Sequence, residues 1–144
     1  MGQQQLLLLV LGIVIVGLAV VVGIQAFGEN QKKANADAMV NDGVRIASDA
    51  QAWRLKPAAF GGGAGNAAAT PWTGLNFQKL GYAVDASSKY TNLNGSYEMT
   101  GADGATLTIT GTGANNVGNT VKVEVTGTTP QSIKTTVNSP AAGN

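Results

Sequence analysis

The segment QQQLLLLVLGIVIVGLAVVVGIQAFGENQKK, residues 3–33, decides the fold, because it contains a long run without charge. Between Leu6 and Phe27 no side chain is charged, and Gln25 is the single polar one. As an α-helix this run extends about 33 Å, close to the ~30 Å hydrocarbon core of a bilayer. A soluble core helix keeps one polar face, and this run has none. We therefore expect a helix that spans a membrane or is enclosed by other helices.

Two other interpretations of the apolar run fit less well. A secretory signal peptide has a basic residue before a shorter apolar stretch of ~7–15 residues, and neither feature is present here. Met1-Gly2 begins a myristoylation pattern, but Leu6 stands where that pattern needs Ser or Thr. The nearby basic residues all follow the helix, so the positive-inside rule alone places the C-terminal part in the cytoplasm. A basic leader, if one had been removed, would reverse that orientation.

Three glycines interrupt the apolar run, at Gly12, Gly17 and Gly23. Small residues in an apolar helix allow a second helix to approach closely. We expect these three positions to be sites of helix–helix packing.

The helical period continues after the apolar run ends. From residue 29 apolar residues recur every three or four positions, which predicts an amphipathic helix. Pro57 ends this pattern, so residues 3–56 are expected to form one helix about 80 Å long, with bends at Gly28 and Gly43. The apolar stripe consists of Ala36, Met39, Val40, Gly43, Ile46, Ala47, Ala50 and Trp53.

The C-terminal third has the alternation of β-strands. From Ser96 apolar residues recur at every second position between Gly-, Asn- and Asp-containing turns, which predicts an antiparallel meander of three to four strands. One face of this sheet is apolar and needs a cover, and the helical stripe is the one amphipathic partner in the chain. The expected inward residues are Tyr97, Met99, Leu107, Ile109, Val121, Val123, Val125, Ile133, Thr135 and Val137, and the expected turns are 101–104, 113–116 and 127–130.

The predicted class is therefore α+β, with a long N-terminal helix packed on a small antiparallel sheet. Four regions follow from the composition: an apolar helix at 1–28, its amphipathic continuation at 29–56, a Gly/Ala-rich connecting region at 57–95, and the β-meander at 96–144.

Composition argues against enzymatic chemistry. The chain has no Cys and no His, so disulfides, the commonest general base and the commonest transition-metal ligand are all missing. The glycines at 61–65 lack the strand and Lys of a phosphate loop. We expect no catalytic residue, no metal, no cofactor and, at a net charge of +1, no nucleic-acid partner. The acids of the helix are expected to lie on a solvated face.

Asn94 belongs to two overlapping patterns. Asn94-Gly95-Ser96 is an N-glycosylation sequon, and Asn-Gly is also a common hairpin turn. The turn is the favoured interpretation, and glycosylation at Asn94 stays open.

The layout of an apolar half-helix, an amphipathic half-helix, a Gly-rich loop and a small sheet resembles the type IV pilin superfamily, including the pseudopilins of type II secretion. The segment ENQKKANADAMVNDGVRIASDAQAW, residues 29–53, is similar to the pilin pattern after the apolar segment. The resemblance implies a precursor in the inner membrane, cut after a glycine by a prepilin peptidase and often methylated at the new N-terminus. Gly2 would be that glycine; in the alternative, Met1 is the mature start.

The resemblance also implies what the protein does. Pilin subunits are passed to an assembly machinery and polymerise through their apolar helices into an extracellular filament used in adhesion, motility or surface contact. The partner of this chain would then be further copies of itself. The alternatives are a pseudopilin of a secretion system, or a single-pass membrane protein whose small outer domain binds a ligand.

One departure from the family pattern concerns charge. Pilins usually carry a glutamate at the fifth mature position, whereas this chain has Gln5 counted from Met1, or Leu7 counted from Gln3. No acid precedes Glu29. We hypothesise that Gln3, Gln4 and Gln5 replace the ion pair with neutral hydrogen bonds, because each amide both donates and accepts.

Overall fold

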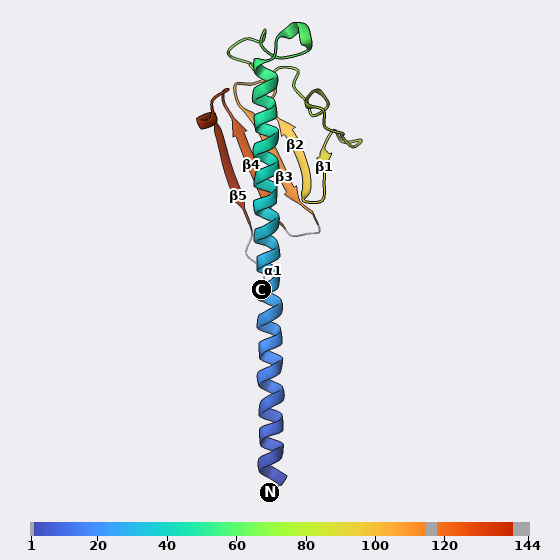
Figure 1. Cartoon of the computed structure of the whole chain (residues 1–144), viewed down its shortest axis with the longest axis vertical. Helices are drawn as coiled ribbons and strands as arrows, with labels where there is room; N and C mark the ends of the chain where they lie inside the picture. Colours follow the sequence, from blue (N-terminus) through green and yellow to red (C-terminus); the bar gives the residue numbers. More distant parts are fainter. Residues whose placement is uncertain (1, 115–117, 140–144) are drawn as a thin grey trace.

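The computed structural model describes residues 2–114 and 118–139 and has an α+β architecture, as predicted. One long helix, α1, carries a single sheet on its C-terminal half, and its N-terminal half projects alone (Figure 1). The helix is α1 (Gly2–Leu55), and the strands are β1 (Tyr90–Thr91), β2 (Gly95–Thr100), β3 (Leu107–Gly113), β4 (Thr120–Val125) and β5 (Ile133–Asn138). Short 3-10 turns lie at η1 (Ala58–Phe60), η2 (Gln78–Leu80) and η3 (Pro130–Ser132).

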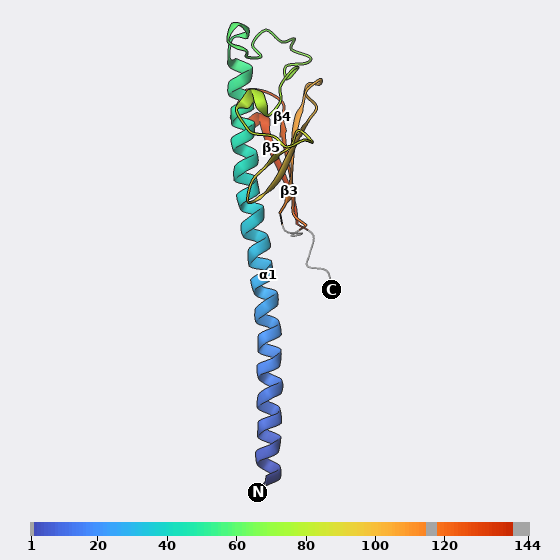
Figure 2. The same ribbon diagram turned by 90° about the vertical axis from the view of Figure 1, so that its right-hand side faces the viewer.

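Helix α1 contains 54 residues and therefore extends about 81 Å. It continues through Gly28 and Gly43 without interruption and ends two residues before Pro57, which cannot donate a backbone hydrogen bond. Figure 2 shows the sheet beside the upper half of the helix, with its far face directed away from α1.

The sheet is a meander in which each strand pairs antiparallel with the next, in the order β1-β2-β3-β4-β5. It has five strands, one more than the three to four expected. The additional strand is β1, inside the region expected to be a loop; two residues are too few to show alternation. Of the expected turn at 113–116, Asn115 and Asn116 lie outside the described residues.

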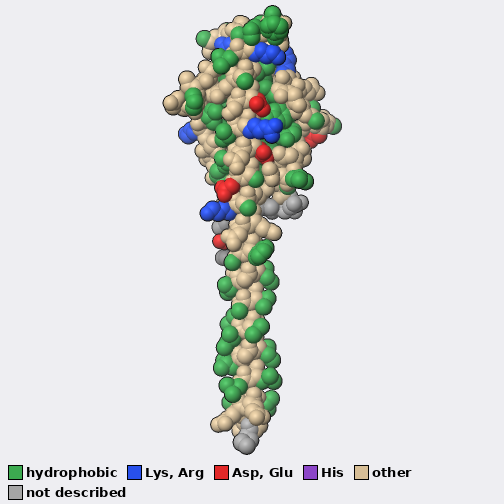
Figure 3. Space-filling view, in the orientation of Figure 1, with side chains coloured by type: hydrophobic (Ala, Val, Ile, Leu, Met, Phe, Trp, Pro, Cys, Tyr) green, Lys and Arg blue, Asp and Glu red, His purple; other side chains and the backbone are tan. Residues whose placement is uncertain are grey.

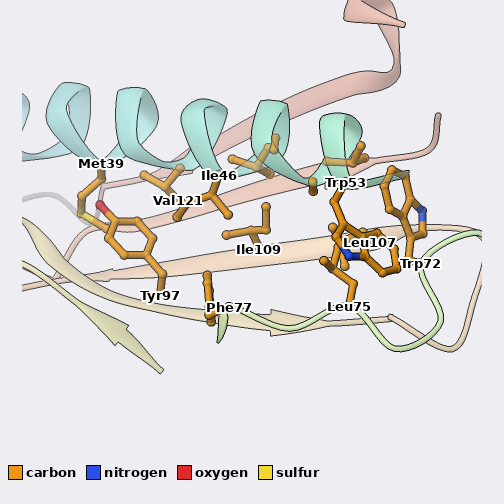
Figure 4. Packing of buried hydrophobic residues seen from close by; sticks show 14 residues of the cluster. Met39, Ile46, Trp53, Trp72, Leu75, Phe77, Tyr97, Leu107, Ile109 and Val121 are labelled. Atoms are coloured by element: carbon orange, nitrogen blue, oxygen red, sulfur yellow. The ribbon is translucent and has the colours of Figure 1, made fainter. Parts of the chain in front are cut away.

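The core lies between the helical stripe and the inner face of the sheet (Figure 4). Met39, Ile46 and Trp53 are among the seven buried helix residues, all of which belong to the predicted stripe. The sheet is tightly apposed at Gly43, where a Cβ atom would lie 2.7 Å from a methyl group of Val123. A side chain at that position would push the sheet away from the helix.

The connecting region contributes to this core, which the sequence did not predict. Trp72, Leu75 and Phe77 are buried, and the Trp72 indole N–H donates to the carbonyl oxygen of Ala105 at 3.2 Å. These apolar residues are three and then two positions apart, so they show neither a helical nor a strand period. Trp72 and Leu75 lie beside Trp53 at the C-terminal end of the stripe (Figure 4). Phe77 lies farther along the core, toward Ile46 and Tyr97.

Candidate functional site

The N-terminal half of α1 is a long apolar surface that the fold leaves exposed. Every large apolar side chain from Leu6 to Phe27 is between 52% and 71% exposed. The most apolar window of this helix has a mean hydropathy of 3.2 and no buried residue, so α1 is long and apolar enough to cross a membrane. Figure 3 shows hydrophobic side chains along the whole visible length of this half, which we call the apolar rod (Leu6–Phe27).

The free energy at stake in the apolar rod is large. Burying one Val, Leu, Ile or Phe side chain contributes about 1.5–3 kcal/mol, so covering the rod contributes on the order of 30 kcal/mol. A folded domain is stable by only about 5–15 kcal/mol. We call the sheet and the connecting region, residues 57–114 and 118–139, the head. Exposure of the rod to water therefore costs more free energy than the folding of the head can supply.

The glycines of the apolar rod are notches that nothing in the described chain fills. No atom lies within 4 Å of a Cβ placed on Gly12, Gly17 or Gly23, apart from the helix's own neighbouring backbone. Gly12 and Gly23 are eleven residues apart and face the same side of a helix with 3.6 residues per turn, whereas Gly17 points about 140° away. Another helix can therefore approach the backbone of the rod closely on two sides, which is the arrangement needed by a helix that packs among several neighbours.

The notch at Gly12 forms a hollow of about 420 Å³ with wholly aliphatic walls. Its lining consists of Leu8, Leu9, Gly12, Ile13 and Val16. A side chain from another apolar helix matches these walls in chemistry and finds the backbone accessible at the glycine.

The three glutamines expected to act together occupy the first turn of α1. Gln3, Gln4 and Gln5 are all exposed, and no hydrogen bond joins their amides to another described residue. A second hollow, lined by Gly2, Gln5, Leu6 and Leu9, lies on this turn. The amides are therefore available to a partner at the tip of the rod.

A polar contact near the lower end of the sheet fixes the head on α1. The Oδ2 atom of Asp42 accepts hydrogen bonds from Asn92 at 2.8 Å, from Asn94 at 2.7 Å and from the Tyr97 hydroxyl at 2.8 Å. These donors come from the β1–β2 hairpin, so a single helix carboxylate positions that hairpin. We call this group the Asp42 clamp (Asp42, Asn92, Asn94 and Tyr97).

The charge of Asp42 is favoured in this setting. Burial opposes ionisation, but the hydrogen bonds from Asn94, Asn92 and Tyr97 and the nearby charge of Arg45 outweigh it, so the pKa of Asp42 lies below its usual value. Burial and the bond to the carboxylate raise the pKa of the Tyr97 hydroxyl. The clamp therefore holds an ionised acid and a neutral tyrosine at physiological pH.

A second helix carboxylate, Asp49, binds the hydroxyl of Tyr82 in the same way. Tyr82 belongs to a chain of rings with Phe77, Tyr90 and Tyr97, in which neighbouring centroids are 4.7–6.2 Å apart. These ring contacts and the bond to Asp49 attach the connecting region to both the sheet and the helix.

The expectation that the helix acids lie on a solvated face is wrong for Asp42 and Asp49, both half-buried and bonded to tyrosines. The spacing of Asp42 and Asp49 in the sequence could have indicated this. Residues seven apart fall on the same flank of a helix, and both flank the apolar stripe. Sequence alone does not identify which tyrosines reach them.

The two ends of the head are also attached to α1. At the lower end the fully buried Asn119 donates to the carbonyl oxygen of Lys32 at 2.7 Å and to Asn35 at 3.1 Å. At the upper end the Gln51 amide donates to the carbonyl oxygens of Gly127 and Thr129, each at 2.9 Å. The head is thus fixed along its whole length, and its position follows that of the helix.

Asn94 lies in the hairpin turn, but the expected Asn-Gly turn is wrong in detail, because Gly95 already belongs to β2 and the two turn residues are Leu93 and Asn94. The backbone N–H of Asn92 bonds the carbonyl oxygen of Gly95 at 2.9 Å and closes the two-residue hairpin between β1 and β2. The Asn94 side-chain nitrogen, to which a glycan would attach, donates to Asp42. A glycan there would have to displace part of the Asp42 clamp.

Among residues 2–114 and 118–139 no group of three potential ligands is placed to hold a metal ion. Comparison of the chain with models of protein families, with curated proteins and with solved structures gave no match. The long helix packed on an antiparallel sheet is consistent with a pilin-like fold.

Proposed function

We propose that this protein is the structural subunit of a type IV pilus-like filament, held in the inner membrane before assembly and built into a surface filament afterwards. The single observation that carries the proposal is the apolar rod, because the described chain has nothing that covers it. A bilayer would cover the apolar side chains of the rod before assembly, and the rods of neighbouring copies would cover them in the filament. No charge has to be buried during that exchange, since the rod contains none.

The attachment of the head supports the same proposal. A subunit that transmits its helix position to the filament surface needs a head that does not swing. The bonds at Asn119, Asp42, Asp49 and Gln51 hold the head at four levels of α1. Parallel packing of the rods then places every head outside the bundle, with its sheet facing solvent.

Electron microscopy of material sheared from cells that express the chain tests the proposal, with mass spectrometry to identify the filament protein. We expect filaments whose main component is this chain. Removal of detergent from the purified full-length protein is expected to give filaments or aggregates. A chain that stayed monomeric without lipid or detergent would refute the proposal.

The same experiments separate the alternatives. A single-pass receptor would remain in the membrane fraction and give no filament on shearing. A pseudopilin would be needed for secretion of another protein and would give no long surface filament in wild-type cells.

A further inference from the structure

The outer face of the sheet, directed away from α1, has an unusual composition. Because side chains alternate along each strand, the register of the strands aligns the outward residues in rows across the sheet. Figure 2 shows this face turned away from α1. One row is Thr91, Ser96, Thr112, Thr120 and Asn138; the next is Glu98, Thr110, Lys122 and Thr136; the third is Thr100, Thr108, Glu124 and Lys134. We call these residues the hydroxyl face, since most of them carry a hydroxyl group.

Most of these hydroxyls are not used to hold the fold. Thr91 and Ser96 bond each other at 3.1 Å, but no hydrogen bond joins the hydroxyls of Thr110, Thr112 and Thr120 to another described residue. Each hydroxyl offers one donor and two acceptor positions to whatever faces it. Their spacing is regular, about 4.8 Å between strands and about 6.8 Å along a strand.

The charges on the hydroxyl face neutralise one another. Its own charged residues are Glu98, Lys122, Glu124 and Lys134, two of each sign. Lys122 pairs with Glu124 at 2.8 Å, and Glu98 pairs at 3.4 Å with Lys89, which lies at the edge of the face. A patch without net charge gives no electrostatic attraction to nucleic acid, an anionic membrane or a charged protein. It complements a partner that is itself uncharged and hydroxylated.

One corner of the face is concave. A hollow of about 310 Å³ lies where the β1–β2 hairpin meets the end of β3, with walls that include Lys89, Thr91, Ser96 and Thr112. Its hydroxyl, amine and backbone groups suit a ligand that forms many hydrogen bonds. None of the residues in the three outward rows is aromatic, so stacking on a sugar ring contributes nothing here.

From these observations we infer that the hydroxyl face binds neutral polysaccharide, with a sugar residue seated in the corner hollow. Hydroxyl-to-hydroxyl bonds that replace bonds to water yield little net free energy each, so one head binds weakly. The inference rests on the proposed function for its strength, because a filament repeats the face many times and converts weak binding into avidity.

Sedimentation with insoluble cellulose or chitin tests the inference, with alginate beads as an anionic comparison. The protein is used as filaments, and as full-length chain in micelles of a detergent without a sugar headgroup. The test variant is Thr110→Val, Thr112→Val and Thr120→Val, which removes hydroxyls and keeps branched side chains. The matched control is Thr70→Val, Thr106→Val and Thr128→Val, three changes outside the hydroxyl face.

We expect filaments to sediment with neutral polysaccharide and the test variant to lose about tenfold in bound fraction, whereas the control binds like the wild type. Equal binding by both variants, or binding to alginate alone that salt abolishes, would overturn the inference. If no filament forms, but the chain in micelles binds the polysaccharide weakly and the test variant does not, the binding role of the hydroxyl face is upheld and the proposed filament is refuted. Filaments of the test variant with normal dimensions exclude an assembly defect.

Discussion

At the scale of single residues, Asp42 links helix and sheet through one oxygen atom that accepts three hydrogen bonds. Asp42→Ala leaves the Tyr97 hydroxyl and two amides without their acceptor, so we expect a loss of about 2–3 kcal/mol in the free energy of unfolding. Thermal unfolding of the full-length chain in micelles, followed by near-ultraviolet circular dichroism, measures it.

Asp37→Ala is the matched control for this prediction. Asp37 lies on the same helix, is exposed, and has no hydrogen bond or ion pair with another described residue. Its removal is expected to change stability by less than about 0.5 kcal/mol. Equal losses in the two variants would show that helix charge, and not the Asp42 clamp, is responsible.

The lowered pKa of Asp42 predicts how stability depends on pH. The unfolded chain binds a proton at this residue near its ordinary pKa of 3.8, and the folded chain binds it only at lower pH, because the pKa of Asp42 is lowered. The contribution is therefore complete above the unfolded pKa and is lost as the pH falls through the folded value. We expect the acid limb of stability below about pH 4 to be shallower in Asp42→Asn than in the wild type. Parallel limbs from pH 2 to pH 7 would contradict this.

At the scale of elements, α1 was the most predictable part. Its extent follows from a run without charge, from apolar residues that recur every three or four positions, and from the proline that ends the pattern. Each of these can be recognised from neighbouring residues alone. The same stripe predicted which helix residues are buried, from Ala36 to Trp53. Alternation likewise predicted β2 to β5, but the burial it implied was wrong for Val137, which was expected on the inner face and is 46% exposed near the end of the edge strand β5.

The remaining elements depend on contacts between distant residues. The hairpin of two-residue β1 is held by Asp42, fifty residues earlier in the sequence. Trp72 is buried, and its indole N–H bonds Ala105, thirty-three residues later. The Asp42 clamp was missed for the same reason: its donors are ordinary turn residues until the fold brings them to the helix.

The glycine notches of the apolar rod give a prediction at this scale. Gly12→Leu fills the hollow that we assign to a neighbouring helix, so assembly is expected to fail or to yield filaments of altered diameter. The fold of the subunit should persist, because a side chain at Gly12 meets no other part of the chain. Electron microscopy and circular dichroism measure the two properties separately. Val14→Leu, which enlarges a side chain within the rod without filling a glycine, is the control and should assemble normally.

At the scale of the whole molecule, the polar and apolar parts of the chain occupy separate volumes. The described charged residues lie at Glu29 or beyond, and the head covers α1 only from about Lys32 upward. In the proposed function, membrane insertion and filament assembly would therefore both involve the apolar rod, and the head would bury no apolar surface in either step. Among the described side chains, the glutamines at the tip and Gln25 near the other end of the rod carry polar groups into that environment.

Those glutamines provide the last prediction. In a filament the first turn of one helix is enclosed by neighbouring rods, where an amide without a partner costs about 1–3 kcal/mol. Gln3, Gln4 and Gln5 can bond one another's copies or a neighbouring N-terminal amine, which fixes the axial position of each subunit. Replacing all three with Leu removes those bonds while keeping the rod apolar. We expect insertion into the membrane to be retained and filaments to be absent or irregular in helical register, as seen by electron microscopy with helical averaging. Replacement with Asn keeps the amide groups and should restore assembly; regular filaments from the Leu variant would show that apolar packing alone sets the register.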